Sequence, residues 1–232
     1  MNIFYTPDMP LETELPEEEA KHCIRVLRMS IGDEITLTDG KGYFYLAEIS
    51  SISGKHCQVN LIKSISQEPL WPCHLHIAMA PTKNMDRNEW FAEKATEIGF
   101  DELSFLNCRF SERKILKTER IQKILVSAIK QSQKARLPKL NEMMNFEQFI
   151  SQNFKGNKFI AHCYNDEKPL LKDIVEKGKD CLVMIGPEGD FSKEEVASAI
   201  THGFIPVSLG KSRLRTETAA LVACHIMNLA NQ

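Results

Sequence analysis

Two polar turns near the end of the sequence contain glycines, and each follows a short apolar run. The first covers residues 186–192, Gly-Pro-Glu-Gly-Asp-Phe-Ser, and the second covers residues 208–218, Ser-Leu-Gly-Lys-Ser-Arg-Leu-Arg-Thr-Glu-Thr. Glycine lets a ligand approach the backbone closely, and ligands of open α/β sheets bind beyond the carboxyl ends of the strands. Both turns are therefore candidate ligand-binding loops, although a tight strand-to-helix turn without a ligand has the same composition.

Each turn leads into a predicted helix. Ser192 and Glu195 have the spacing of a capping box. Thr216 is the expected N-cap of an apolar helix over residues 219–230. A helix amino end beside the arginines of the second turn suits an anionic or electron-rich ligand. A capped terminal helix with solvated charges is the alternative interpretation.

The tripeptide Gly210-Lys211-Ser212 has the sequence that ends a Walker A loop. That motif also needs a glycine five residues before Gly210, where this chain has Ile205. The phosphate-binding loop is therefore incomplete, and the sequence argues against a nucleotide-dependent phosphotransferase.

The chain has seven cysteines and no C-x-x-C pair, which indicates reduced thiols rather than a disulfide framework. Five of the cysteines adjoin a histidine in sequence. Neighbouring residues point in different directions on a strand or a helix, so they seldom bind one ion together. His74 and His76 are two apart on a predicted strand, a more permissive spacing, and for them too we favour a structural role. No metal site is predicted.

Basic residues concentrate in the middle of the chain. Residues 107–140 carry ten Lys and Arg side chains against two Glu, whereas the formal net charge of the whole chain is −2. Such a local excess is typical of a surface that contacts phosphates, and a solvated helix face is the alternative. The candidate RNA contacts in this tract are Arg109, Arg113, Lys114, Lys134 and Arg136.

A chain of 232 residues is expected to form two domains. Residues 1–66 alternate short β-type runs with Gly-containing turns, interrupted by one helical stretch over residues 16–28. Two prolines in residues 67–72 mark the boundary. Strand-like and helical runs then alternate, which predicts a parallel sheet with crossover helices. We expect a small, mainly β domain over residues 1–68 and an α/β domain over residues 73–232.

No targeting or membrane segment is expected. The apolar runs fall short of the roughly 18 residues of a membrane span, and the acidic start lacks a charged-then-apolar leader. These features predict a cytoplasmic protein without a membrane partner.

Residues 185–189 and 209–219 resemble the cofactor motifs of the SPOUT superfamily, in particular those of the RsmE-type uracil N3-methyltransferases of small-subunit ribosomal RNA. Further matches follow along the whole chain in the order and spacing of that family. They are His22 with residues 25–28 and 32–33, residues 94–99, and Gln131-Ser132 followed by Pro138.

The resemblance implies a PUA-like β-barrel followed by a SPOUT methyltransferase domain whose carboxyl-terminal segment forms a trefoil knot. It also implies S-adenosylmethionine as cofactor, a homodimer, and a target uridine in the decoding region of 16S ribosomal RNA within the 30S particle. DNA is not an expected partner.

Methyl transfer to uracil N3 needs donor and base held in near-attack geometry and stabilisation of the negative charge that builds on the flanking oxygens. We expect both turns to grip the cofactor, Arg215 to orient cofactor and base, and Glu217 to position the base or relay its proton. We expect Arg25 and Arg28 of the first domain to provide further contacts with the RNA backbone. The expected cofactor-binding residues are Gly186, Pro187, Glu188, Gly189, Ser208, Leu209, Gly210, Leu214, Arg215, Thr216 and Thr218.

Four positions depart from the family pattern. That pattern has a second glycine in place of Asp190, an acidic residue in place of Lys130, and arginines in place of Phe110 and Ser212. An arginine stands one place away from each of the last two positions. We therefore expect the departures to alter RNA contacts more than the cofactor loops.

Two other functions remain open from the sequence. A non-catalytic RNA-binding protein would use the same basic tract without a cofactor. A related SPOUT methyltransferase acting on transfer RNA or on another ribosomal position would share the fold and the methyl donor.

Overall fold

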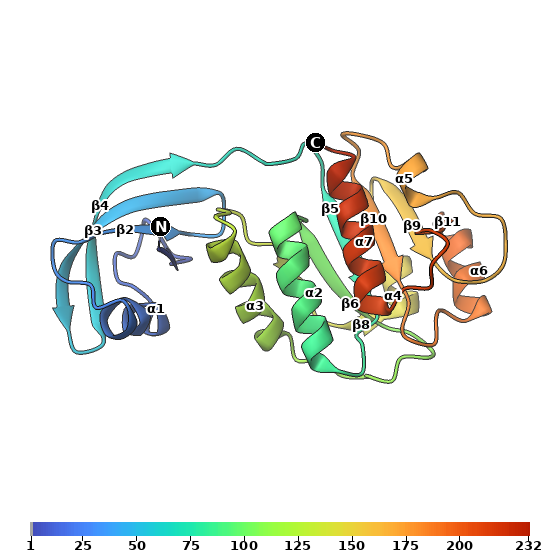
Figure 1. Cartoon of the computed structure of the whole chain (residues 1–232), viewed down its shortest axis with the longest axis horizontal. Coiled ribbons are helices and arrows are strands. Elements are labelled where there is room, and N and C mark those ends of the chain that lie inside the picture. Colours follow the sequence, from blue (N-terminus) through green and yellow to red (C-terminus); the bar gives the residue numbers. More distant parts are fainter. Residues whose placement is uncertain (1) are drawn as a thin grey trace. The chain divides into compact units, whose positions relative to one another are not determined.

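The computed structural model describes residues 2–232, which form two compact units (Figure 1). Unit 1 comprises the residues up to Leu70 together with Val126–Leu137, and unit 2 comprises Trp71–Leu125 and Pro138–Gln232. A segment from the middle of the chain therefore packs with the amino-terminal residues, which the sequence pattern did not indicate.

Unit 1 is built on a four-stranded sheet in the order β1-β2-β3-β4. β1 (Ile3–Tyr5) pairs with β2 (Glu34–Thr38) in parallel, and β3 (Tyr43–Ser53) and β4 (His56–Ser66) continue the sheet in antiparallel pairs. Buried and accessible residues alternate along β2 and the first half of β3, so one face of the sheet covers the core of this unit.

The predicted helix over residues 16–28 is confirmed, but it changes type halfway. α1 (Glu17–Lys21) continues directly into the π-helix η1 (His22–Val26). The backbone N–H of Leu27 bonds the carbonyl of His22 at 3.0 Å, five residues back, as a π-turn requires. Arg28 then takes a positive φ of 56°, which ends the helix.

Residues 126–137 join unit 1 through backbone and charge contacts. They include the end of α3 (Thr118–Gln131). The Gly42 N–H bonds the Ala135 carbonyl at 2.8 Å. The Lys130 ammonium lies 2.7 Å and 2.8 Å from the two carboxylate oxygens of Glu19. This pairing explains how a lysine is accommodated at position 130.

Unit 2 contains a seven-stranded sheet in the order β11-β9-β10-β5-β6-β7, with β8 paired to β6. Every pairing in it is parallel, so the α/β fold class predicted from the alternating pattern is confirmed. The strands are β5 (Leu75–Met79), β6 (Glu102–Asn107), β7 (Lys139–Leu140), β8 (Met144–Asn145), β9 (Asn157–Ala161), β10 (Cys181–Ile185) and β11 (Ile205–Val207).

Helices cover both faces of this sheet. They are α2 (Met85–Ile98), α4 (Phe146–Ile150), α5 (Leu171–Ile174), α6 (Lys193–Thr201) and α7 (Thr216–Leu229).

α2 and α7 lie side by side, and α7 also packs on β5 and β10 (Figure 1). α4 and α6 contribute to the core on the side of Ala78 and Met184. Because both faces are covered, β5 and β10 are buried along their whole length.

α2 has defined ends. Asn84 caps it by accepting the Asp86 N–H at 3.0 Å, and Gly99 is its C-cap. Gly99 has φ 124°, and a Cβ there would lie 2.4 Å from the Trp71 ring, so only glycine fits. Among the helices of residues 2–232, none combines the length and apolar character needed to cross a membrane.

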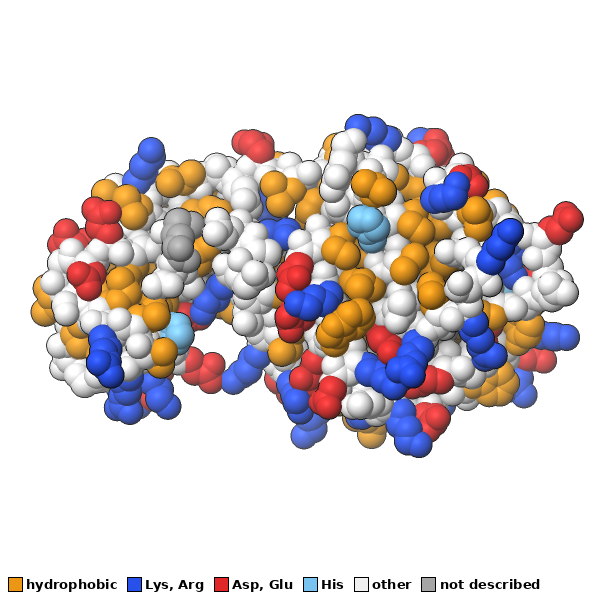
Figure 2. All heavy atoms as spheres, in the orientation of Figure 1, with side chains coloured by type: hydrophobic (Ala, Val, Ile, Leu, Met, Phe, Trp, Pro, Cys, Tyr) orange, Lys and Arg blue, Asp and Glu red, His pale blue; other side chains and the backbone are white. Residues whose placement is uncertain are grey.

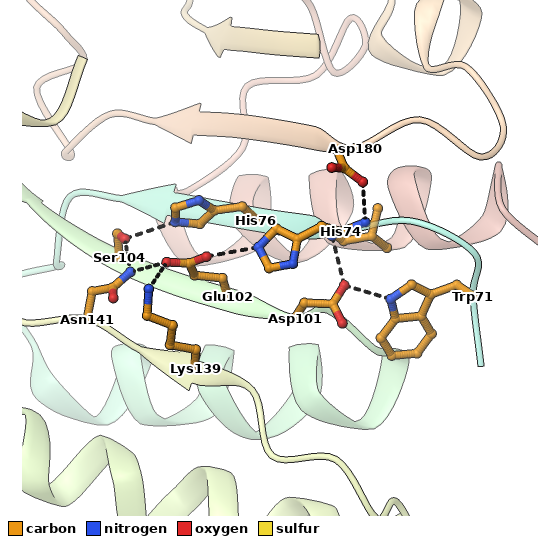
Figure 3. A network of polar contacts seen from close by, with 10 residues as sticks. Trp71, His74, His76, Asp101, Glu102, Ser104, Lys139, Asn141 and Asp180 are labelled. Atoms are coloured by element: carbon orange, nitrogen blue, oxygen red, sulfur yellow. Dashed lines mark hydrogen bonds and ion pairs between the residues drawn. The ribbon is translucent and has the colours of Figure 1, made fainter. Parts of the chain in front are cut away.

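A network of polar side chains lies at the amino ends of β5, β6 and β10 (Figure 3). A side-chain hydrogen bond of 2.8 Å joins His74 Nε2 to Glu102 Oε2. It raises the pKa of His74 and holds the pKa of Glu102 well below its usual range. Lys139 and Asn141 also donate to Glu102, at 2.9 Å and 2.6 Å.

His76 lies beside this network but in the core. Its Nε2 is 2.9 Å from Ser104 Oγ, and its ring packs edge-on against Phe149. Burial lowers the pKa of His76 to about 4, so the ring is neutral at pH 7. Both histidines are therefore structural, and within residues 2–232 no three His, Cys, Asp or Glu side chains group as metal ligands.

We predict that His76 makes the protein sensitive to acid. Its folded-state pKa lies below the unfolded value, so protons bind the unfolded chain first and stability falls as pH drops from 6.5 towards 4. The loss attributable to His76 should be roughly 3 kcal/mol over this range.

Urea unfolding at a series of pH values checks this prediction. His76→Gln should flatten the curve below pH 6.5, because glutamine can still bond Ser104 but does not titrate. His74→Gln is the matched control. Because the pKa of His74 is raised in the folded protein, its protonation stabilises the fold at low pH. His74→Gln should therefore make the decrease in stability at low pH steeper. Parallel curves for wild type and His76→Gln would contradict the assignment.

Candidate functional site

Three loops meet at the carboxyl ends of neighbouring strands in unit 2. β9 lies between β10 and β11 in the sheet, and all three strands run in parallel. The loops that follow them therefore leave the sheet at the same edge. These are residues 162–170, 186–192 and 208–215, and the last two contain the predicted cofactor turns.

Two adjoining pockets open between these loops. The larger pocket, about 750 Å³, lies between the loops after β9 and β11. The smaller pocket, about 320 Å³, lies between the loop after β10 and the first turn of α7. Cys163, Asp190 and Leu214 are among the residues that line both pockets.

The predicted site residues are divided between the two pockets. Ser208, Leu209 and Gly210 line the larger pocket, and Leu214 lines both. Gly189, Glu217 and Thr218 line neither. Five of the predicted residues line only the smaller pocket, namely Gly186, Pro187, Glu188, Arg215 and Thr216.

The loop after β10 is closed by Asp190. The Asp190 N–H bonds the Pro187 carbonyl at 2.9 Å to form a turn. The Asp190 backbone has φ 66°, a left-handed conformation that favours glycine but that aspartate tolerates better than most residues. This conformation explains why the related motif has glycine at the position. The Asp190 carboxylate also accepts the Cys163 N–H at 2.7 Å, so it ties the loop after β10 to the loop after β9.

Two further contacts hold the same loop. The Glu188 carboxylate accepts the Lys83 N–H at 2.8 Å, which anchors the loop to the segment before α2. A Cβ at Gly186 would lie 3.0 Å from the Phe191 nitrogen, and this close packing favours glycine. The predicted capping box of Ser192 and Glu195 is confirmed, and it fixes where the loop ends.

The loop after β11 is held by Ser208. Its backbone N–H bonds the Pro169 carbonyl and its carbonyl accepts the Leu171 N–H, both at 2.9 Å. Its hydroxyl oxygen accepts the Gly210 N–H at 3.2 Å. Gly210 has φ 132°, and a Cβ there would meet no atom within 4 Å. The backbone at Gly210 is therefore open towards the pocket.

The expected N-cap at Thr216 is wrong. Arg215 is the N-cap of α7, in an extended conformation and without a side-chain cap bond. Thr216 is the first helical residue and is buried. Thr216 already belongs to the helix, and the extended residue before it takes the capping position. The exposed Arg215 instead stands at the positive end of the helix and at the wall of the smaller pocket.

Glu217 is a buried carboxylate with incomplete partners. Its side chain is 8% exposed, and its Oε1 lies 3.7 Å from Nη1 of Arg87. Its Oε2 is buried without a hydrogen-bond partner. A buried oxygen left unpaired costs free energy, so such groups call for an explanation in function. Arg87 also lines the smaller pocket.

The loop after β9 contributes polar groups that the sequence reasoning missed. His162 and Lys168 are both nearly excluded from solvent, with side chains 0% and 7% exposed. Lys168 Nζ is 3.3 Å from His162 Nδ1. Burial, helped by this ammonium, lowers the pKa of His162. The only sequence signal at this loop was the end of a predicted strand.

The residues predicted to contact RNA differ in their exposure and in the partners they already have within the protein. Arg109 is exposed and pairs with Glu194 at 2.8 Å. Arg113 donates to the carbonyls of Thr82 and Lys83. Lys114 donates to the Cys108 carbonyl at 3.1 Å.

The remaining candidates lie in unit 1. Arg25, Arg28 and Arg136 are exposed. Lys134 is only 9% exposed, so we do not retain it as a phosphate contact.

Three comparisons with known proteins agree with this geometry. Residues 69–228 match the model of an RNA methyltransferase domain, and residues 15–62 match that of an RNA methyltransferase PUA domain. A ribosomal RNA small subunit methyltransferase E of Buchnera aphidicola is 31% identical over 216 residues, which cover 90% of this chain and 84% of the relative.

Solved structures give the same result. A probable rRNA-methyltransferase from Porphyromonas gingivalis superposes with a TM-score of 0.93 at 44% identity, covering 100% of this chain and 98% of that one. A ribosomal RNA small subunit methyltransferase E from Neisseria gonorrhoeae, bound to S-adenosyl methionine, has a TM-score of 0.83 at 28% identity, covering 97% and 95%.

The fold and the two pockets define the class, an RNA methyltransferase with an attached PUA domain. Within that class, the chain belongs to the ribosomal RNA small subunit methyltransferase E family. The resemblance carried by residues 185–189 and 209–219 is thereby confirmed.

We predict that the Asp190 side chain stabilises the contact between the loop after β9 and the loop after β10. Asp190→Ala should lower the free energy of unfolding by about 2 kcal/mol, because it removes the bonds to Cys163 and Phe191 and keeps the positive φ. Asp190→Gly loses the same bonds but relieves the backbone by about 1 kcal/mol. Glycine should therefore be the milder change.

Urea unfolding gives the two free energies, and amide exchange reports on the loops directly. Exchange at the Cys163 N–H should become faster in both variants, since its acceptor is gone. If Asp190→Ala were as stable as Asp190→Gly, the backbone argument would fail.

Proposed function

We propose that this protein transfers a methyl group from S-adenosylmethionine to N3 of a uridine in the decoding region of small-subunit ribosomal RNA. The observation that carries the proposal is the pair of adjoining pockets at the carboxyl ends of β9, β10 and β11, in a chain of an RNA methyltransferase family. One pocket would take the donor and the other the target base.

The larger pocket suits the donor. Its volume of about 750 Å³ falls in the usual range for small-molecule sites. Val207, Leu209 and Leu214 provide apolar wall for a purine ring. The open backbone at Gly210 provides hydrogen-bonding groups without steric hindrance. Bound here, S-adenosylmethionine would supply an activated methyl group on a sulfonium.

The smaller pocket suits a single pyrimidine base. At about 320 Å³ it is large enough for a pyrimidine base, and Arg213 and Arg215 are in its wall. A base stacked in a helix could not enter it, so the target nucleotide must be unpaired or flipped out. Arg215 can stabilise the negative charge that builds on the uracil oxygens as N3 loses its proton.

Glu217 is the candidate acceptor for that proton. It follows Thr216, which lines the smaller pocket, and its Oε2 has no hydrogen-bond partner. An N–H at uracil N3 would supply the missing donor. The carboxylate would hold the base in place and take up the proton as N3 becomes nucleophilic.

RNA backbone contacts would come from basic residues near the smaller pocket. A hollow of about 350 Å³ is lined by Lys83, Arg113 and Lys114, together with Glu112 and Ile115. Lys83 was not among the residues singled out from the sequence. Its N–H bonds Glu188, whose side chain lines the smaller pocket. In unit 1 we propose that Arg25, Arg28 and Arg136 provide further contacts with the RNA backbone.

A homodimer is proposed from the outer face of α7. Leu229 and Trp90 are 56% and 42% exposed, and Leu221, Val222 and Ile226 are half-buried on the same helix as Leu229. Figure 2 shows hydrophobic side chains gathered where α7 lies. A continuous apolar patch of this kind favours association.

Three further features of the family are proposed with the function. We propose a trefoil knot in the carboxyl-terminal segment, a cytoplasmic location, and an assembled 30S particle as the substrate. All three follow from membership of the family and from the expected target.

We predict that Arg215→Ala abolishes most methyl transfer. Loss of the guanidinium should lower the rate by about 100-fold or more, while Tm stays nearly constant because Arg215 is exposed. The assay uses labelled S-adenosylmethionine with small ribosomal particles from cells that lack the enzyme, and mass spectrometry then identifies the modified nucleoside.

This assay also separates the alternatives. Binding of S-adenosylmethionine in a calorimetric titration would exclude a non-catalytic RNA-binding protein. A modified nucleoside other than N3-methyluridine, or transfer only to transfer RNA, would identify a different substrate. Full activity of Arg215→Ala would remove Arg215 from the site.

We predict that RNA binding depends steeply on salt. If three phosphates are contacted, raising the salt concentration from about 50 to about 200 mM should lower the affinity for RNA roughly 40-fold. The double variant Lys83→Ala, Lys114→Ala should reduce both the affinity and the salt dependence. Lys179→Ala, an exposed lysine paired with Glu176, is the matched control. Fluorescence anisotropy with a ribosomal RNA fragment measures the effect, and an affinity that is independent of salt would contradict this surface.

A further inference from the structure

Arg87 and Glu217 connect the first turns of two parallel helices. Arg87 is the third residue of α2 and Glu217 is the second residue of α7. The helices are parallel and stay in register, because the Asn228 side chain near the end of α7 bonds the Gly99 carbonyl at the end of α2 at 3.3 Å. Arg87 Nη1 and Glu217 Oε1 are thereby held 3.7 Å apart.

The two partners of this ion pair differ in how deeply they are buried. The Glu217 side chain is 8% exposed, whereas the Arg87 side chain is 38% exposed. A separation of 3.7 Å is too long for a hydrogen bond, and the second carboxylate oxygen is buried with no partner. Arg87 is the only cation that forms an ion pair with this carboxylate among residues 2–232. A carboxylate this deeply buried depends strongly on its single counter-charge.

The position of Arg87 links that counter-charge to the pocket. Its side chain lines the smaller pocket together with Arg215 and Thr216. Arg87 therefore borders the pocket, while its Nη1 lies 3.7 Å from Oε1 of the buried Glu217 carboxylate. A loss of Arg87 would leave the Glu217 carboxylate without its counter-charge and free to rotate away from its present orientation.

We infer that Arg87 is a positioning residue for methyl transfer, which acts by holding Glu217 as an oriented carboxylate beside the target base. The inference rests on the proposed function. It assigns Arg87 a role through Glu217 rather than direct contact with the reacting atoms.

The test is a double-variant cycle on the full-length protein with Arg87→Met, Arg87→Lys, Glu217→Gln and the combination of Arg87→Met with Glu217→Gln. Arg87→Met should lower kcat by about 30-fold, with the Kd for S-adenosylmethionine changed less than about 3-fold. Arg87→Lys should recover most of the rate, because it restores a cation. The combined variant should be no slower than Glu217→Gln alone.

Stability without any ligand gives an independent readout. Arg87→Met should lower Tm by several degrees, since it leaves a buried charge unpaired. Adding Glu217→Gln should recover most of that loss, because the neutral amide no longer needs a counter-charge. Lys179→Met serves as control for the loss of an exposed cation, with little change expected in rate or Tm.

The outcomes separate the inference from the proposed function. If the wild-type protein neither binds S-adenosylmethionine nor transfers a methyl group, the proposed function fails. If the wild type is active and Arg87→Met is equally fast, or if its effect multiplies with that of Glu217→Gln, the positioning role of Arg87 is overturned.

Discussion

The parallel pairing of β9 with both β10 and β11 is the constraint on which the site depends. These three strands are separated along the chain by helices and loops, yet their backbone hydrogen bonds place their carboxyl ends at one edge of the sheet. Each loop alone is a short turn without a cavity. Only their convergence produces two adjoining pockets, and the Asp190 carboxylate holds two of the loops together through the Cys163 N–H.

Buried carboxylates at the two ends of this sheet differ in how completely they are hydrogen-bonded. At the amino ends, Glu102 has hydrogen bonds from His74, Lys139 and Asn141 (Figure 3). A network so well satisfied rigidifies the fold. At the carboxyl ends, Glu217 keeps one oxygen without a partner. The fold therefore satisfies a buried carboxylate fully at the amino ends of the strands and only in part at their carboxyl ends.

Unit 1 contributes in a different way. Its sheet has a packed core that includes Leu37, Ala47 and Ile49, and the π-turn at residues 22–26 ends in the exposed Arg25 and Arg28. Lys130 and its neighbours return from the middle of the chain to this unit. Part of the basic tract therefore belongs to each unit.

The sequence by itself determined the local structure and carried the family resemblance. Alternating strand-like and helical runs predicted the α/β character of unit 2, and Ser192 with Glu195 marked the start of a helix that the structure confirms. These features depend on neighbours along the chain, which a sequence displays directly. The two motifs of residues 185–189 and 209–219 were recognisable for the same reason, since each is one continuous run.

Tertiary structure decided what depends on contacts between distant residues. Thr216 had the residue type of a cap, but packing of α7 buried it and left Arg215 at the helix end. Lys134 counted as a basic residue, but folding of residues 126–137 onto unit 1 buried it. Arg87 carried no motif, and its importance arises because α2 and α7 run in parallel and bring it within 3.7 Å of Glu217. Burial and pairing are properties of the packed chain, so no local pattern could have revealed them.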